Sequence, residues 1–434
     1  MLSYFKQSVR AKAPSSTRSR NLSRKISPRI RLKIINQFFP PDYAPTGQLI
    51  AELAHQLKDE LGPIEIFASQ PSYAFDSDDS PTWEHYDDTL TIRRSQSTRL
   101  WPSRIRGKAF SGVIFFVRAA INLLKHTQRR ELVLLTTAPP FLPFLGYLLS
   151  KVCNIQYVCL LYDLYPDIAV NLQVLSPGHW IVKLWETCNF LTWNRSAAII
   201  VLSNAMKVRI TKKYPALEDK IVVLPTWADP QYIKPIPKQN NWFAKQHGLV
   251  KPFTVLYSGN MGRCHDIQTL LEAIVLLRDR PFQFVFIGSG AKFNVVSEQV
   301  KRLKLENCLF LPYQSREVLP FSLTACDVSI VSIRGDMEGL VVPSKLYSSL
   351  ATGRPVVGIC ESYSYLNALV DRAQCGATFR NGDSEGLAQY LEKLSQDPEW
   401  AAKLGQSGRD YCISNFTVEK ISQDYLQLFQ SFQK

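Results

Sequence analysis

Residues 31–69, RLKIINQFFPPDYAPTGQLIAELAHQLKDELGPIEIFAS, indicate what kind of fold the chain adopts. The apolar run 32–39 predicts a short strand, and PPDYAPTG predicts a loop because of its Pro and Gly content. Apolar residues then recur at helical spacing from Leu49 to Leu61, with Thr46 as the expected N-cap. PIEIFAS supplies a second strand. The order strand, loop, helix, strand predicts a βαβ unit.

The rest of the chain repeats this pattern. In the first half, apolar runs end in polar or Pro residues, as in ELVLLTTAPP, IQYVCLLYDLYPD and AAIIVLSNAMKVRI. Such runs are typical of strands buried on both faces of a parallel sheet. Five further strands are expected in the second half, namely FTVLYSG, FQFVFIGSG, CLFLPY, DVSIVSI and RPVVGIC. A chain of 434 residues therefore predicts two doubly wound α/β lobes, with a ligand between them at the carboxyl ends of the strands.

These patterns divide the chain into five segments. Residues 1–31 form a basic tail that we expect to be disordered, and residues 32–228 form the first Rossmann-like lobe. The Pro- and Asn-rich segment 229–250 is the expected interdomain connection. Residues 251–415 form the second Rossmann-like lobe. The amphipathic helix within 416–434 is expected to cross back to the first lobe.

Charge and cysteine content restrict the setting in which the chain works. The net charge is +14, of which the nine Lys/Arg of the acid-free tail supply nine. A solvated tail, a tether to an anionic membrane or polyanion, and an organelle transit peptide are three interpretations of this tail. The sequence contains no uninterrupted run of about eighteen apolar residues, so no membrane span is predicted. Nine scattered cysteines without a C-x-x-C pair indicate reduced thiols in the cytosol.

The segment GDMEGLVVPSKLYSSLATGRPVVGI, residues 335–359, places Lys345 at the start of an expected helix. A cation there is unfavourable by about 1 kcal/mol because of the helix dipole. A bound anion removes this cost, since the ammonium and the helix N–H groups then point at the same charge. Ser344 is the expected cap and Gly353 the expected end of the helix. An anion site is favoured over a solvated surface lysine.

Two other turns of the second half are suited to anions. YSGNMGRCHD (257–266) leaves a strand through Gly259, Asn260, Gly262 and Arg263, and FIGSGAK (286–292) leaves another through Gly288 and Gly290. Neither turn matches the P-loop or the dinucleotide fingerprint. Three such turns at the strand ends of one lobe predict a site for a nucleotide diphosphate. Gly47 of the first lobe is expected to approach the same phosphates from the opposite side.

No metal site is expected. The D-x-D in DSDD (76–79) lies in an acidic stretch without a flanking buried strand, which favours a solvated loop. The six histidines show no metal-ligand spacing. Nothing resembles a serine nucleophile elbow.

Taken together, these segments resemble family 4 glycosyltransferases of the GT-B fold, in the exopolysaccharide and colanic-acid-type branch. The matching pieces run in order from about residue 32 to 415, and the segments GNMGR and PSKLY are the most specific of them. The resemblance implies two Rossmann-like lobes facing a central cleft. It also implies a UDP- or GDP-sugar donor in the second lobe and a saccharide or lipid-linked acceptor on the first. Transfer would be of the hexosyltransferase type, with retention of configuration and without a metal or another cofactor.

The resemblance also implies roles for particular residues. Gly47 matches the loop glycine of the first lobe, and Asp163 matches the acidic position near the transferred sugar. In the second lobe, the donor-binding segments are Gly259 to Arg263, Gly288 with Gly290, and Ser344 with Lys345. Glu338 is a candidate for the first glutamate of the family's E-x7-E pair. Arg263 and Lys345 would stabilise the leaving diphosphate.

Four positions depart from the family pattern. Ser348 stands where the second glutamate is expected, and Tyr162 where a histidine is expected before Asp163. Cys264 or His265 replaces a basic residue. The hinge reads PTW (225–227) where PNW is usual.

The acceptor side is less determined. Residues 98–130 mix bulky apolar residues with Arg and Lys. They predict either a helix in a membrane interface, which would admit a lipid-linked acceptor, or a core helix with a basic flank. With the basic tail, this favours a cytoplasmic protein attached to the inner face of the plasma membrane. A GT-B nucleotide-sugar epimerase and an inactive binding or scaffolding protein remain as alternatives. Nucleic-acid binding is disfavoured, because the tail lacks interleaved aromatic residues.

Overall fold

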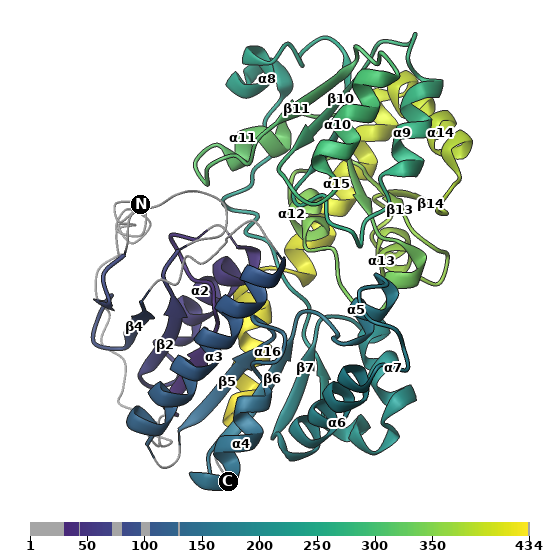
Figure 1. Cartoon of the computed structure of the whole chain (residues 1–434). Coiled ribbons are helices and arrows are strands. Elements are labelled where there is room, and N and C mark those ends of the chain that lie inside the picture. The colour runs from purple at the N-terminus through teal and green to yellow at the C-terminus, as the bar shows by residue number, and fades with distance from the viewer. Residues whose placement is uncertain (1–29, 43, 72–79, 97–104, 129–130, 433–434) are drawn as a thin grey trace, which may run out of the picture.

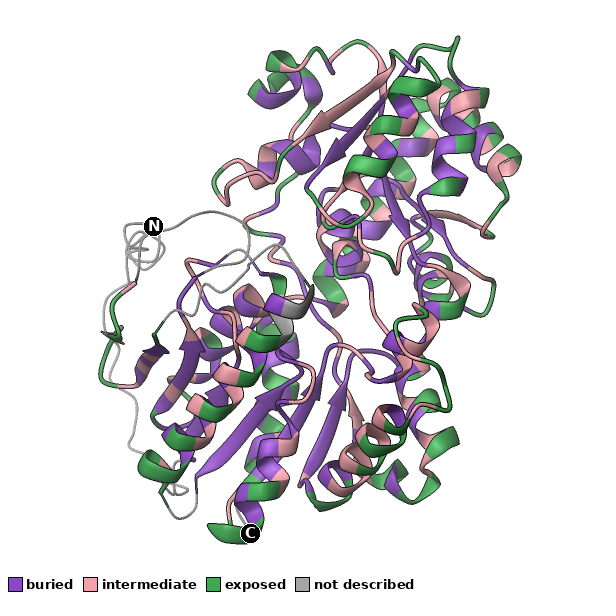
Figure 2. Cartoon of the chain, viewed as in Figure 1, coloured by how far each residue is buried: buried purple, intermediate pink, exposed green. Residues whose placement is uncertain are grey.

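The structure is a computed structural model that describes residues 30–42, 44–71, 80–96, 105–128 and 131–432. Two lobes are each built around their own sheet, and helices flank both sheets (Figure 1). The strands of both sheets are largely buried (Figure 2). The predicted α/β class with two doubly wound lobes is confirmed. The basic tail up to residue 29 and the D-x-D of residues 76–79 lie outside the described residues.

The N-terminal sheet contains eight strands in the order β3-β4-β2-β1-β5-β6-β7-β8. All neighbours pair in parallel except β3 with β4. Every residue of β1, β5 and β7 is buried, which explains why these strands read as continuous apolar runs. The strands are β1 (Leu32–Ile35), β2 (Ile64–Ser69), β3 (Trp83–His85), β4 (Leu90–Ser95), β5 (Leu132–Thr136), β6 (Gln156–Leu161), β7 (Ala198–Val201) and β8 (Ile221–Val223).

The helices of this lobe follow the expected alternation with strands. They are α2 (Pro45–Leu57), α3 (Ile105–His126), α4 (Phe144–Val152), α5 (Asp167–Asn171), α6 (Trp180–Arg195), α7 (Asn204–Lys213) and the 3-10 turn η1 (Pro215–Lys220). The prediction that Thr46 caps α2 is wrong, because the helix begins at Pro45 with Ala44 as N-cap. Proline suits the first helical position, where its missing N–H group has no partner to lose.

The C-terminal sheet contains six parallel strands in the order β11-β10-β9-β12-β13-β14. The five strands expected in this half are present, namely β9 (Phe253–Ser258), β10 (Phe282–Ile287), β11 (Cys308–Leu311), β12 (Val328–Ser332) and β13 (Val356–Ile359). The pattern did not reveal β14 (Gly376–Phe379). This strand lies at the sheet edge, is only partly buried and has no apolar run.

The C-terminal lobe also has helices around its sheet. They are α9 (Gln268–Leu276), α10 (Phe293–Arg302), α11 (Leu319–Thr324), η3 (Gly335–Met337), α12 (Lys345–Ala351), α13 (Tyr365–Ala373), α14 (Ser384–Gln396) and α15 (Pro398–Asn415). Gly353 follows α12 with φ +69°, as expected for a residue that ends a helix.

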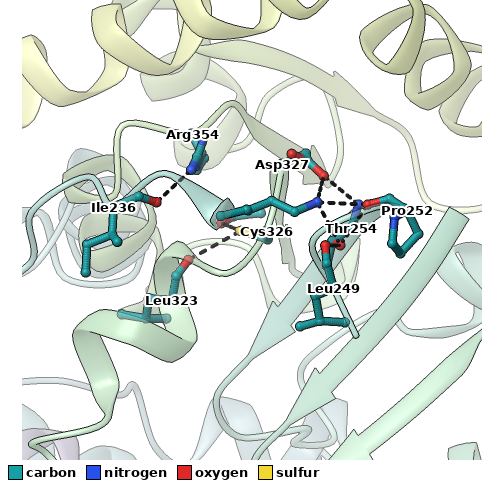
Figure 3. Close-up of polar contacts among 10 residues, drawn as sticks. Ile236, Leu249, Pro252, Thr254, Leu323, Cys326, Asp327 and Arg354 are labelled. Carbon is teal, nitrogen blue, oxygen red and sulfur yellow. Dashed lines mark hydrogen bonds and ion pairs between the residues drawn. The ribbon is translucent and has the colours of Figure 1, made fainter. Parts of the chain in front are cut away.

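The segment 229–250 is anchored to the C-terminal lobe in its second half, which contains η2 (Lys238–Asn240) and α8 (Trp242–Gln246). The buried Lys238 ammonium lies 2.5 Å from the Asp327 carboxylate and donates to the Pro252 carbonyl at 2.8 Å and the Thr254 hydroxyl at 3.2 Å (Figure 3). Arg354 also donates to the Ile236 carbonyl at 3.0 Å. The part free to act as a hinge is therefore shorter than 229–250.

The end of the chain crosses to the N-terminal lobe. Ala228 donates to the Phe416 carbonyl at 3.0 Å, so the outgoing and returning segments run side by side. The last helix, α16 (Val418–Gln430), then packs against α2. The Tyr425 ring meets the Trp227 ring edge-on, with centroids 6.4 Å apart. Two covalent segments therefore join the lobes at one place.

Candidate active site

The two glycine turns of the C-terminal lobe pack against each other at the carboxyl ends of β9 and β10. The Gly259 N–H group donates to the Ile287 carbonyl at 2.8 Å, and the Met261 N–H group donates to the Ser289 carbonyl at 2.7 Å. The two turns thus form one paired loop. We name residues 258–263 and 288–292 the double turn.

Glycine is required at the centre of the double turn. Gly259, Gly288 and Gly290 have φ values of +123°, +134° and +135°. A Cβ atom on Gly288 would lie 2.3 Å from the Gly259 carbonyl oxygen, and one on Gly290 would lie 2.3 Å from Asn260 Oδ1. Backbone and small side chains can approach this closely only because these positions lack a Cβ atom. Gly262 is less restricted, since its Cβ atom would lie 3.2 Å from Asn260 Nδ2.

Lys345 reaches from α12 to the double turn. Its ammonium donates to the Asn260 carbonyl at 3.3 Å and lies 3.7 Å from the centroid of the Tyr257 ring. Burial lowers the pKa of Lys345 to about 7. In the part of the chain that the structure describes, no carboxylate forms an ion pair with this ammonium. The arrangement thus leaves a cation, held on an aromatic face, available to an anion at the double turn.

Ser344 does not cap α12. Its backbone is already helical, with φ −56° and ψ −27°, and its side chain makes no capping hydrogen bond. The capping role expected for Ser344 is therefore wrong. The residue is exposed directly before Lys345. Its contact with a donor stays a prediction.

Arg263 is exposed on the double turn, and its carbonyl accepts a hydrogen bond from Arg334 at 3.2 Å. His265, which follows it closely, is not a second cation. Burial lowers the pKa of His265 to about 3, and its Nδ1 atom lies 2.7 Å from the Ser332 carbonyl oxygen. A neutral imidazole does not replace the basic residue that the family pattern has near this position.

Asp163 lies where the two lobes meet. It follows β6 in the N-terminal lobe and forms a backbone bridge with Val341 of the C-terminal lobe. The next residue, Leu164, donates to the Leu340 carbonyl at 2.9 Å. Burial raises the pKa of the Asp163 carboxyl group to about 6. The carboxyl ends of both sheets therefore face a common region, in which Asp163 lies beside the segment that leads to Lys345.

Glu338 holds the loop before Lys345 in place. Its carboxylate accepts from the Ser364 hydroxyl at 2.6 Å and from the Tyr365 N–H group at 2.8 Å. Its carbonyl accepts from Arg209 of the N-terminal lobe at 3.2 Å. With both carboxylate oxygens bonded at the start of α13, the geometry points to a positioning residue. A catalytic role for Glu338 stays a prediction.

Gly47 is buried in the first turn of α2. A Cβ atom at this position would lie 3.0 Å from the backbone of Phe38 and 3.1 Å from that of Phe39. Glycine thus lets α2 approach the loop that follows β1. Its contact with donor phosphates stays a prediction.

Sequence reasoning missed three contributors to this region. Tyr257 reads as one more apolar residue of β9, and nothing local indicates that its ring carries the Lys345 ammonium. Glu52 and Arg316 form a pair between the lobes, 3.0 Å apart, across 264 residues of sequence.

Within the described ranges, no group of three or more His, Cys, Asp or Glu side chains is arranged to hold a metal ion.

The family model described as "Glycosyl transferases group 1" matches residues 238–411, which contain the double turn and Lys345. The C-terminal lobe therefore carries a group 1 glycosyltransferase domain. The resemblance noted from the sequence is thereby confirmed, and the chain is a glycosyltransferase.

Two relatives extend the match of this glycosyltransferase over most of its length. WbjE, a glycosyltransferase of Pseudomonas aeruginosa, is 24% identical over 370 residues, which cover 84% of this chain and 90% of WbjE. WcaI of Escherichia coli (strain K12), assigned to colanic acid biosynthesis as a glycosyl transferase, is 22% identical over 351 residues. The match covers 77% of this chain and 84% of WcaI.

Solved structures confirm the GT-B fold of the glycosyltransferase. Sucrose-phosphate synthase from Thermosynechococcus elongatus superimposes with a TM-score of 0.74 at 17% identity, covering 93% of this chain and 99% of that one. Anabaena HepE in complex with UDP-glucose superimposes with a TM-score of 0.69 at 14% identity, covering 93% of this chain and 100% of that one.

Proposed function

We propose that this glycosyltransferase moves a sugar, with retention of configuration, from a UDP- or GDP-sugar to a saccharide or lipid-linked acceptor. We further propose that it works in cell-surface or exopolysaccharide biosynthesis, in the cytoplasm and at the inner face of the plasma membrane. The UDP-glucose complex of HepE supports the donor class, and the colanic acid role of WcaI supports the pathway class. The proposed reaction uses neither a metal nor another cofactor.

The observation that carries the proposal is the position of the Lys345 ammonium at the double turn. In the reaction, the bond between the anomeric carbon and the diphosphate oxygen breaks, and its electron pair stays with the diphosphate. Lys345, with Arg263 at the edge of the double turn, would stabilise this growing negative charge. Preorganised charges of this kind supply a large share of catalysis in many enzymes.

The acceptor completes the reaction from the side of the N-terminal lobe. Its hydroxyl oxygen forms the new bond to the anomeric carbon, on the face that the diphosphate leaves. Its proton passes to the departing phosphate oxygen. Asp163, where the lobes meet, would orient the sugar or the acceptor hydroxyl groups.

Thermal melting against UDP, GDP, ADP and CMP, without added metal, tests the donor site. We expect one diphosphate at about 100 times its Kd to stabilise the protein by about 2.7 kcal/mol. The same ligand should not stabilise Lys345→Ala. Absence of stabilisation by every diphosphate would contradict the proposed donor site.

Product analysis with the matching nucleotide sugar separates the alternatives. A transferase needs an acceptor to form product, whereas an epimerase converts the nucleotide sugar alone. A scaffolding protein would bind the nucleotide without turnover.

A further inference from the structure

Helix α3 exposes a stripe of apolar side chains. Between residues 110 and 124, the positions that are exposed are all large and apolar. We name them the α3 stripe: Phe110 49% exposed, Val113 49%, Val117 51%, Ile121 46% and Leu124 52%. Their spacing of three and four residues places them along one side of the helix. Figure 2 shows exposed positions along the outer side of α3, away from the sheet.

The stripe is separate from the side of α3 that packs in the core. Phe115, Ala119 and Leu123 are buried, and the Phe115 ring stacks on Phe67 of β2 with centroids 5.7 Å apart. A surface helix whose inner side is packed in this way normally carries charged or polar residues on its outer side. A role as a core helix explains the inner side of α3 and leaves the stripe unexplained.

Neighbouring helices expose further apolar residues. α4 packs against both α3 and α6. The exposed residues are Leu148 and Val152 on α4, which are 40% and 76% exposed, and Trp180 and Leu184 on α6, which are 67% and 54% exposed. No helix among the described residues is long and apolar enough to cross a membrane.

The sequence that contains the stripe is strongly basic. Residues 89–162 contain eleven Lys/Arg and a single acidic residue, Glu131. Glu131 is buried and pairs with Lys33 at 3.7 Å, so it does not neutralise the surface. Lys125 at the end of α3 and Lys151 on α4 are exposed. A partner for this region has to be both apolar and anionic, which disfavours a second copy of the same basic surface.

We propose that the α3 stripe is a docking surface for an anionic lipid bilayer, with α3 lying in the plane of the interface. Apolar side chains of such a helix enter the boundary between headgroups and acyl chains, while flanking lysines contact anionic headgroups. The inference deepens the proposed function, on which it rests for its link to a lipid-linked acceptor. The docking itself involves no catalytic residue.

Co-sedimentation of the full chain with lipid vesicles tests the proposal. The vesicles are phosphatidylcholine with or without phosphatidylglycerol, each at low and high salt. We expect binding to the anionic vesicles that salt weakens but does not abolish, since apolar insertion is not screened. The variant Val117→Ser/Ile121→Ser/Leu124→Ser should bind these vesicles at least tenfold more weakly.

A matched control separates the stripe from general surface hydrophobicity. Val208→Ser/Leu276→Ser/Val295→Ser removes three apolar residues that are 62%, 53% and 55% exposed on α7, α9 and α10. This variant should bind vesicles as the unchanged protein does. Both variants should keep the melting temperature and the diphosphate-induced stabilisation, which reports the donor site independently of docking.

Three results would overturn the proposal. One is vesicle binding by the stripe variant equal to that of the unchanged protein. Another is binding that disappears on replacing Arg18, Arg20, Arg24 and Lys25 of the tail with Gln but not on changing the stripe. The third is a dimer in light scattering that the stripe variant converts to a monomer, without vesicle binding by either. None of these results bears on the donor site.

Discussion

The Arg316 guanidinium of the C-terminal lobe lies 3.0 Å from the Glu52 carboxylate of the N-terminal lobe. It also donates to Gln48 Oε1 at 2.6 Å, and Trp227 in the lobe connection donates to Glu52 at 2.8 Å. Burial raises the pKa of Glu52, and Arg316 opposes this effect. The start of α2 is thus bonded to the C-terminal lobe and to the connection, which stabilises the present arrangement of the lobes.

Arg316→Ala should weaken this arrangement. A double-mutant cycle with Glu52→Gln in denaturant unfolding is expected to give a coupling of about 1–2 kcal/mol, because the pair is partly buried and charge-assisted. Small-angle X-ray scattering of Arg316→Ala should show a larger radius of gyration. If the two substitutions change the free energy of unfolding additively and the radius of gyration stays the same, the pair does not stabilise the arrangement of the lobes.

Donor binding should be accompanied by proton uptake at Lys345. With a pKa of about 7, its side chain is mostly neutral at pH 8 in the free protein. A bound diphosphate favours the ammonium and raises this pKa, so about one proton is taken up at pH 8. Calorimetry in buffers of different ionisation enthalpy measures this number. The uptake should fall away as the pH drops below 7, where the free side chain already carries its proton.

Lys345→Arg is the matched control for this measurement. A guanidinium stays charged at every pH used, so its contribution to proton uptake disappears. Uptake of the same size in Lys345→Arg would assign the proton to another group.

Lys345→Ala should lower kcat/KM by about 10²–10³-fold, as does loss of one preorganised charge-stabilising group in other enzymes.

Asp163 should determine the acid side of the pH profile. Its carboxyl group has a pKa of about 6 and is protonated below that pH. If the carboxylate orients substrate, kcat/KM of the free enzyme falls about tenfold per pH unit below 6. Asp163→Asn keeps the backbone bridge to Val341 and should lower kcat/KM and remove this acid limb. Full activity in Asp163→Asn would reduce Asp163 to a structural residue of the loop.

Gly288→Ala should damage the double turn. The substitution places a Cβ atom 2.3 Å from the Gly259 carbonyl oxygen at a φ of +134°, so the turn has to shift. We expect a loss of about 1–3 kcal/mol in the free energy of unfolding, and at least tenfold weaker diphosphate binding. Gly178→Ala is the control, since nothing lies within 4 Å of its added Cβ atom. Equal effects of the two substitutions would contradict the requirement for glycine.

Lys238→Ala should destabilise the C-terminal lobe. It removes the cation that pairs with Asp327 at 2.5 Å and leaves that carboxylate without its charge partner. A loss of about 3 kcal/mol in the free energy of unfolding is expected for a broken buried pair. The exposed Lys234, in the same connection, serves as control, and Lys234→Ala should change stability by less than about 0.5 kcal/mol. If Lys238→Ala leaves the free energy of unfolding unchanged, the connection does not depend on this pair.

The sequence predicts the fold well where a single physical signal dominates. Strands such as β5 and β12 are buried on both faces, so they read as apolar runs. The edge strand β14 lacks that signal because it is half-buried, and the pattern misses it. The capping predictions for Thr46 and Ser344 failed for another reason. A side chain suited to capping does not determine where the backbone becomes helical, and Pro45 begins α2 one residue earlier than Thr46.

Part of the site could be predicted from the sequence, because its elements lie at one edge of a sheet. Glycine turns at successive strand ends indicate the double turn. A lysine at the start of a helix, where positive charge is unfavourable, indicates the anion site at Lys345. The partners of these groups depend on contacts between distant segments. Tyr257 under Lys345, Ser364 on Glu338 and Arg316 beside Glu52 have no local pattern, since each contact forms only after the sheets and lobes have assembled.

The return of the chain to the N-terminal lobe has a consequence for biosynthesis. The α2 surface against which α16 packs stays uncovered until α16 has been made, although α2 is synthesised before the C-terminal lobe. Domains usually fold as they emerge from the ribosome. Here the N-terminal lobe is complete only after the whole C-terminal lobe has been synthesised, so no single cut in the chain can separate two complete lobes.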